Sequence, residues 1–88
     1  MKINPDFTIQ KVGASWVAVP VGEASRRFHG MLQLNETGAF LWQLMAERDC
    51  SESELVDALL AEYDVDRALA EADVARIVAS LAEVGVFA

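Results

Sequence analysis

The spacing of apolar residues changes once along this chain, at Asn35, and that change constrains the fold more than any other feature. Before Asn35, apolar and polar residues alternate, as they do from Phe7 to Val12, and such alternation is typical of half-buried strands. After it, apolar residues recur every three or four positions, beginning in LNETGAFLWQLM (residues 34–45). That period is typical of helices with one face on a core. The chain therefore predicts strands first and helices afterwards.

Three short alternating segments in the first third are expected to be strands: Phe7–Val12, Trp16–Val21 and His29–Asn35. Gly13, Ala14 and Ser15 fit a short hairpin turn between the first two. Pro20 has no N–H to donate, so its part of the second strand should lie at an edge or an end of the sheet. The polar stretch GEASRRF (residues 22–28) is predicted to be a loop. Such a small antiparallel meander needs a helix layer to cover one face.

Three helices with recognisable ends are predicted in the remaining two thirds. Asn35 can cap the first, Ser51 and Glu54 form a capping box at the start of the second, and Asp66 can cap the third. Gly85 suits the left-handed position just past the end of the last helix. With 88 residues the chain has room for one core. We therefore expect a single α+β domain over residues 1–88, a three-stranded antiparallel sheet followed by three helices.

The residues needed for catalysis or metal binding are scarce. The chain has one cysteine and one histidine, so it can form neither an internal disulfide nor a Cys/His zinc site. His29 has no catalytic partner at a recognisable spacing and is expected to be a structural or loop residue. Cys50 is expected to be a surface or half-buried thiol before a helix. The sequence therefore predicts a protein that is not an enzyme and uses no metal or cofactor.

Charge is unevenly distributed along the chain. The net charge is −7, made of +2 in residues 1–34 and −9 in residues 35–88. Nucleic-acid binding relies on clustered Lys and Arg, so the acidic helical part argues against a nucleic-acid partner. No apolar run approaches the roughly 20 residues of a membrane span, and the first residues lack a signal-peptide core. We expect a cytoplasmic protein without membrane contact.

Three segments in order carry a resemblance: LNETGAFLWQLM, SESELVDALLAEYDVD (residues 51–66) and AEADVARIVASLAEVGVF (residues 70–87). Together they resemble the PqqD-like family, the recognition elements for ribosomally made, modified peptides. The resemblance implies a small winged-helix-like fold that binds the leader segment of a precursor peptide. It also implies presentation of that peptide to a modifying enzyme, expected to be a radical S-adenosylmethionine enzyme.

The resemblance also implies where the peptide binds. The leader would add a strand to the third strand and lie against the last helix, and an open sheet edge can accept an extended peptide in this way. The predicted peptide-binding residues are Gly30, Met31, Leu32, Gln33, Leu34, Asp73, Arg76, Ile77, Ser80 and Leu81. Ile77 and Leu81 could instead be purely core residues. Arg26 and Arg27, just before the third strand, would favour an acidic leader.

Two other functions stay open from the sequence. The same order of elements could form a winged-helix regulator that binds DNA or docks another protein, or a structural subunit of a larger enzyme. An exposed strand edge also allows pairing between copies, so either a monomer or a strand-swapped dimer is expected.

Overall fold

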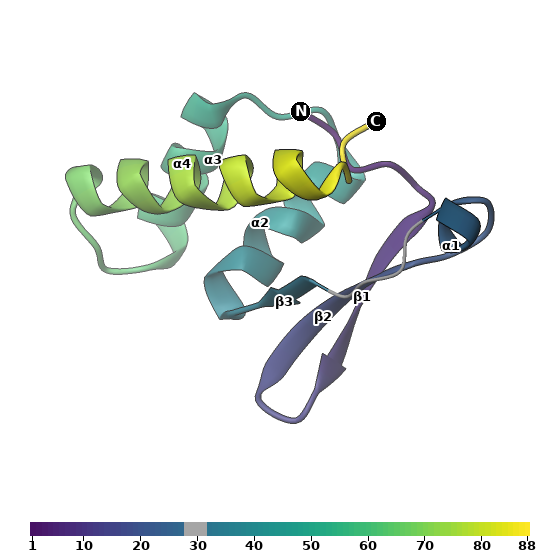
Figure 1. Cartoon of the computed structure of the whole chain (residues 1–88). Helices are drawn as coiled ribbons and strands as arrows, with labels where there is room; N and C mark the ends of the chain where they lie inside the picture. The colour runs from purple at the N-terminus through teal and green to yellow at the C-terminus, as the bar shows by residue number, and fades with distance from the viewer. Residues whose placement is uncertain (28–31) are drawn as a thin grey trace.

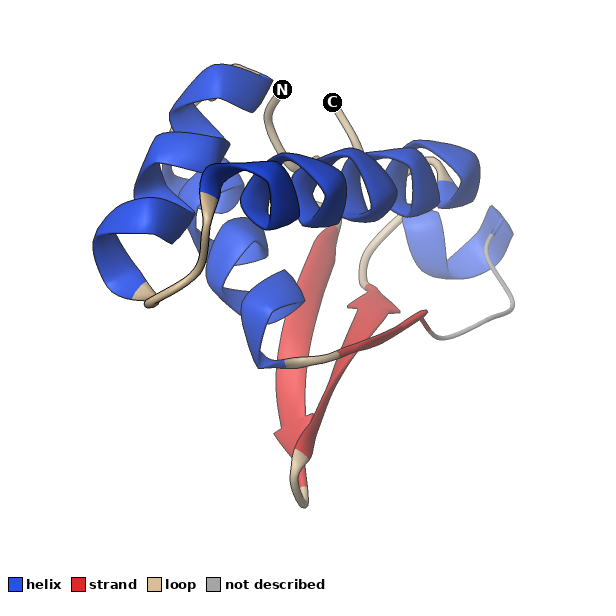
Figure 2. Ribbon diagram, turned by 90° about the vertical axis from the view of Figure 1, so that its left-hand side faces the viewer, coloured by secondary structure: helices blue, strands red, loops and turns tan. Residues whose placement is uncertain are grey.

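The computed structural model describes residues 1–27 and 32–88. Its elements are β1 (Phe7–Val12), β2 (Ser15–Pro20), α1 (Ala24–Arg27), β3 (Leu32–Leu34), α2 (Glu36–Glu47), α3 (Glu52–Glu62) and α4 (Arg67–Val84). The predicted α+β order, a three-stranded antiparallel sheet followed by three helices, is confirmed. Helices α2, α3 and α4 gather on one side, α1 lies apart from them beside the sheet, and the tip of the β1–β2 hairpin projects away from the three long helices (Figure 1, Figure 2).

The sheet has the order β1-β2-β3, with both pairings antiparallel. Val12 pairs with Ser15 across a two-residue turn, and Gly13 has the positive φ of 63° that such a turn requires. Pro20 is the last residue of β2, as its missing N–H predicted. Described β3 residues start at Leu32, and the earlier part of the predicted third strand lies outside the described residues. The hairpin therefore places β3 at one edge of the sheet.

One prediction in this region was wrong, because residues 24–27 of the expected loop form the short helix α1. The N–H and the hydroxyl of Ser25 both donate to the carbonyl oxygen of Gly22, at 3.2 and 2.7 Å. The N–H of Arg26 donates to the carbonyl of Glu23 at 3.2 Å. These bonds close a single helical turn. Because the segment is short and polar, it has no apolar period that would predict a helix.

The predicted helix caps are present. The side chains of Asn35, Ser51 and Asp66 each accept a hydrogen bond from the N–H three residues later, at 2.8, 3.1 and 2.7 Å. The capping box is completed by the N–H of Ser51, which donates to Glu54 at 3.0 Å. The bonds from Ser51, together with the guanidinium of Arg48 at 2.8 Å, lower the pKa of Glu54 to about 2. Local side-chain chemistry thus sets where each long helix starts.

The core lies between the helices and one face of the sheet. Helix α2 packs on β2, β3 and α3, and α4 packs on α3; α4 crosses in front of α2 in Figure 1. The largest fully buried side chains are Trp42, Leu41, Met45, Leu55, Leu59, Leu81, Val74, Val86 and Cys50. Burial of such side chains is the main stabilising contribution in a domain of this size.

The two ends of the chain close one side of this core, a contact that the sequence did not reveal. Ile3 is 3% exposed and bridges to Phe87, and its N–H donates to the carbonyl of Met45 at 3.0 Å. Gly85, with φ of 88°, ends α4 in the predicted left-handed conformation and turns the tail toward Ile3. The two ends consequently lie side by side (Figure 1, Figure 2).

The expectation for Cys50 was wrong. Cys50 is 1% exposed, and its N–H donates to the carbonyl of Met1 at 2.8 Å. The first residues of the chain cover the thiol, and this coverage comes from a segment almost 50 positions away in sequence. Cys50 is therefore a small apolar core residue here rather than a surface thiol.

Candidate functional site

The open edge of the sheet is defined by which residues of β2 hydrogen-bond to β1. The N–H of Val21 donates to the carbonyl of Asp6 at 2.7 Å, and this pair continues the register in which Thr8 faces Val19. In an antiparallel pair, hydrogen-bonded and non-hydrogen-bonded positions alternate. The odd-numbered residues of β2 therefore point their main-chain groups at β1, and the even-numbered ones point theirs at β3.

The same alternation decides how β3 presents its own backbone. Leu32 and Leu34 face Ala18 and Trp16, two even-numbered residues of β2, so their main-chain groups point into the sheet. Gln33 lies between them, and its N–H and C=O therefore point away from β2. No strand pairs with this edge among the described residues. Gln33 thus offers one donor and one acceptor to an added strand.

A groove of about 270 Å³ lies beside this edge. Residues 76, 77, 80 and 81 fall on one face of α4 because helical neighbours recur at three and four positions, and the first turn of α2 closes one end. The groove is lined by Leu32, Gln33, Leu34, Asn35, Gly38, Arg76, Ile77, Ser80 and Leu81. It therefore joins a strand edge, a helix cap and a helix face that are up to 49 residues apart in sequence.

The groove has an apolar floor and a polar rim. Leu34, Ile77 and Leu81 are buried, with exposed fractions of 8%, 5% and 0%, whereas Arg76 and Ser80 are exposed. Apolar lining with a few polar groups is typical of ligand-binding pockets. Such a groove beside an open edge can hold an extended chain by main-chain bonds and take an apolar side chain on its floor.

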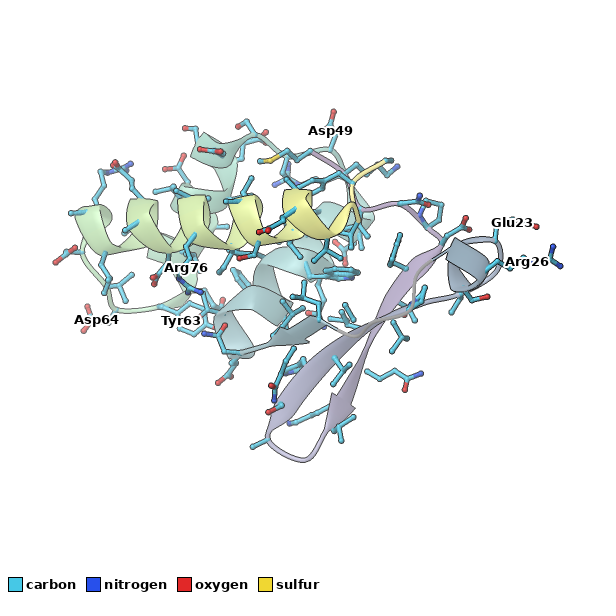
Figure 3. The ribbon with its side chains drawn as sticks, viewed as in Figure 1. Glu23, Arg26, Asp49, Tyr63, Asp64 and Arg76 are labelled. Carbon is cyan, nitrogen blue, oxygen red and sulfur yellow. The ribbon has the colours of Figure 1, made fainter. Side chains whose placement is uncertain are left out.

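Arg76 supplies the positive charge of the groove. Its guanidinium lies 3.8 Å from a carboxylate oxygen of Asp73, one turn earlier on α4, and its side chain leaves α4 on the side of β3 (Figure 3). Both side chains are partly exposed, at 60% and 35%, and such pairs are weak. A guanidinium has five N–H donors, so Arg76 can bind another carboxylate while it keeps this one.

Most of the residues predicted from the sequence come together here. Seven of the ten line the groove. Asp73 does not line it but forms an ion pair with Arg76, which does. Gly30 and Met31 lie outside the described residues. The prediction missed Asn35 and Gly38, although the Asn35 cap itself was recognised. Asn35 caps α2 directly after β3, and its side chain bonds the N–H of Gly38. A cap at the junction of the strand and the helix therefore predicts that both residues lie beside the end of β3.

Neither a metal site nor a membrane-spanning helix occurs among the residues that the structure describes. Within residues 1–27 and 32–88 no group of three His, Cys, Asp or Glu side chains could hold a metal ion. Over those residues, too, no helix combines the length and the apolar character needed to cross a membrane. The groove beside β3 is the candidate functional site.

The chain belongs to the family described as coenzyme PQQ synthesis protein D (PqqD), whose sequence pattern matches residues 16–86. This match confirms the resemblance seen in the sequence. No curated protein matches the chain.

Two solved structures are similar in both fold and sequence. One is TbiB1 in complex with the TbiA(beta) leader peptide, with a TM-score of 0.73, 27% identity and coverage of 98% of this chain and 93% of that one. The other is lasso peptide synthetase B1 complexed with the leader peptide, with a TM-score of 0.68, 28% identity and coverage of 93% and 89%. Both similar proteins are small chains solved with a leader peptide bound.

Proposed function

We propose that this protein binds the leader segment of a ribosomally made precursor peptide and presents it to a modifying enzyme. The leader adds a strand to the open edge of β3 and lies in the groove between β3 and α4. The observation that carries the proposal is the outward backbone of Gln33 directly beside the apolar floor. Family membership and the two leader-peptide complexes support the same function.

Side chains must supply most of the affinity. Each main-chain hydrogen bond contributes only about 0.5–1.5 kcal/mol net, and in the described part of β3 only Gln33 presents its backbone outward. Leu32 is a half-buried apolar residue of the groove, beside the buried floor of Leu34, Ile77 and Leu81, so an apolar leader side chain can be desolvated against it without opening the core. Specificity therefore comes from the leader residue that reaches this floor.

Charge sets a second preference, for an acidic leader. Arg76 lies in the groove wall. Arg26 is exposed on α1, which precedes β3 in sequence. The two side chains lie far apart, toward opposite ends of the molecule (Figure 3), so carboxylates at two separate places on the leader would be attracted, and binding would weaken as salt is added. Replacing Arg26 and Arg27 by Ala should weaken binding and flatten its salt dependence, and an unchanged salt profile would reject the acidic leader.

The protein would have no catalytic activity of its own and would act in the cytoplasm, where ribosomal precursors are made. Its partner enzyme is expected to be a radical S-adenosylmethionine enzyme from the family resemblance. One of the two similar structures is a lasso peptide synthetase B1, which favours an enzyme of lasso-peptide formation as the alternative partner. The two candidate partners can be distinguished by an assay. One precursor with its leader is given to an enzyme of each class, with and without this protein, and the partner is the enzyme whose modification of the precursor depends on this protein.

The binding mode is tested by removing one outward N–H at each edge of the sheet. Gln33→Pro removes the N–H that would bond the leader, whereas Lys11→Pro removes the N–H that faces outward on β1, opposite Trp16. Neither residue donates to β2, so both variants should fold. Peptides encoded by short reading frames beside the gene are then titrated by calorimetry against each variant.

We expect Gln33→Pro to abolish measurable leader binding and Lys11→Pro to leave it within twofold of the unchanged protein. Retained leader binding in a Gln33→Pro variant that is folded by circular dichroism would mean that the leader does not add to β3. Failure of every encoded peptide to bind the unchanged protein more tightly than about 100 μM, with the enzyme present, would count against the function itself.

A further inference from the structure

A second cavity lies on a different face of α2 and shares no residue with the groove. It has a volume of about 220 Å³ and contains three aromatic rings and two carboxylates among its walls. Its lining residues are Trp16, Glu36, Ala39, Phe40, Gln43, Glu62 and Tyr63. Helical spacing separates these α2 residues from those that line the groove, so both cavities can be occupied at once.

The two carboxylates leave this cavity with uncompensated negative charge. Within residues 1–27 and 32–88, neither Glu36 nor Glu62 forms an ion pair. Burial raises the pKa of the Tyr63 hydroxyl, and the charges of Glu36 and Glu62 raise it further. Both carboxylates therefore act on Tyr63, which lines the same cavity, and negative charge beside an aromatic ring favours a cation there.

The rings are arranged to receive a cation as well. Phe40 and Tyr63 pack edge to face, with centroids 5.7 Å apart and planes at 87°, and Tyr63 lies beside the first turn of α2 (Figure 3). The ammonium of Lys11 lies 5.8 Å from the centroid of Trp16, so this ring already interacts with one cation at the margin of the cavity. Lys11 is not part of the cavity wall, so the cavity itself has no cation from the described residues.

We propose that this cavity binds an arginine side chain of the modifying enzyme, an inference that rests on the proposed function. A guanidinium is planar, stacks on aromatic rings and bonds carboxylates with several donors at once, whereas an ammonium is more strongly hydrated. The position suits a docking contact, since Trp16 pairs with Leu34 of the groove through the sheet. The leader would occupy one face of α2 and the enzyme the other.

A small probe tests the chemistry of the cavity. N-acetylarginine amide is titrated into isotopically labelled protein, and the indole N–H signals of the two tryptophans are followed by nuclear magnetic resonance. Trp42 is 2% exposed and outside the cavity, so it serves as an internal control. We expect Trp16 to shift with a Kd of about 1–10 mM, Trp42 to stay unchanged, and neutral N-acetylcitrulline amide to produce no shift.

Variants connect the probe to the enzyme. Glu36→Gln with Glu62→Gln should abolish the Trp16 shift and raise the Kd for the modifying enzyme encoded beside the gene about tenfold. The matched control, Glu47→Gln with Glu83→Gln, removes two exposed charges elsewhere and should change neither measurement. Equal effects of both pairs on the enzyme Kd would indicate general electrostatics and overturn the proposal. An equal response to the arginine and citrulline compounds would also overturn it.

Leader titration keeps this inference separate from the proposed function. The Glu36→Gln, Glu62→Gln variant should bind the leader as tightly as the unchanged protein, because neither residue lines the groove. If the leader binds but the enzyme Kd is unaffected by these changes, the arginine site is wrong and the proposed function stands. If no leader binds at all, the proposed function fails, whatever the arginine probe shows.

Discussion

Gly38 offers a direct test of the groove, because a single added methyl group there should separate stability from binding. Gly38 is the third residue of α2 and forms part of the groove wall. A Cβ at this position would lie 3.3 Å from Oδ1 of Asn35 and 3.4 Å from Cδ2 of Leu34. The first contact is tight and the second is at the short end of ordinary van der Waals contact, so Gly38→Ala would displace the cap, and with it the adjoining groove wall, by a few tenths of an ångström.

The effect on folding should be small, because two contributions oppose each other. Alanine is favoured over glycine within a helix by about 1 kcal/mol, and weakening the Asn35 cap costs about 1 kcal/mol. Binding has no such compensation. Overpacking a filled apolar site by one methyl group costs about 1–3 kcal/mol, which corresponds to a rise in Kd of roughly 5- to 150-fold.

We expect Gly38→Ala to change the free energy of unfolding by less than about 1 kcal/mol, measured by urea titration, while the leader Kd rises at least fivefold by calorimetry. Truncating the leader residue that fills the floor to Ala should remove most of this difference, as a double-mutant cycle would show. An unchanged Kd would place the leader away from the first turn of α2 and refute the reasoning. A large loss of stability would show that Leu34 cannot give way.

Three further changes test the fold that holds the groove. Gly85→Ala should lower the free energy of unfolding by roughly 1–2 kcal/mol, because a side chain disfavours the φ of 88°. No atom lies within 4 Å of the added methyl group, so no clash adds to this cost. Gly85→Asn should cost less in the same urea titration. Leu55→Ala should cost about 2–5 kcal/mol, since Leu55 is 0% exposed. Folding lowers the pKa of Glu54 from 4.5 to about 2, so its contribution is present above pH 4.5 and lost as pH falls toward 2. Urea titrations across this range should show that Glu54→Gln removes that part of the pH dependence.

The parts of the fold that the sequence predicted correctly depend on neighbours in sequence. Asn35, Ser51 and Asp66 each bond an N–H three residues away, and the left-handed turn at Gly85 follows directly from the end of its helix. Such contacts require no knowledge of the rest of the chain. The long helices could be located from these signals and from the period of their apolar residues.

The parts that were missed depend on segments far apart in sequence. Ile3 reaches Phe87, and Met1 covers Cys50, yet nothing in the first six residues has the length or alternation of a strand. A three-residue strand such as β3 is likewise too short to reveal which of its backbone groups face outward. Composition and periodicity contain no information about such pairings.

The orientation of Gln33 shows how one distant contact can decide a functional question. From the sequence, its N–H could face either β2 or a bound peptide, and a shift of one residue in register would exchange the two. The bond between Val21 and Asp6 fixes the alternation in β2, and the pairing of Leu34 with Trp16 transfers it to β3. The β1–β2 hairpin therefore contributes to peptide binding without touching the peptide, because it determines which backbone groups of β3 are left open beside the groove.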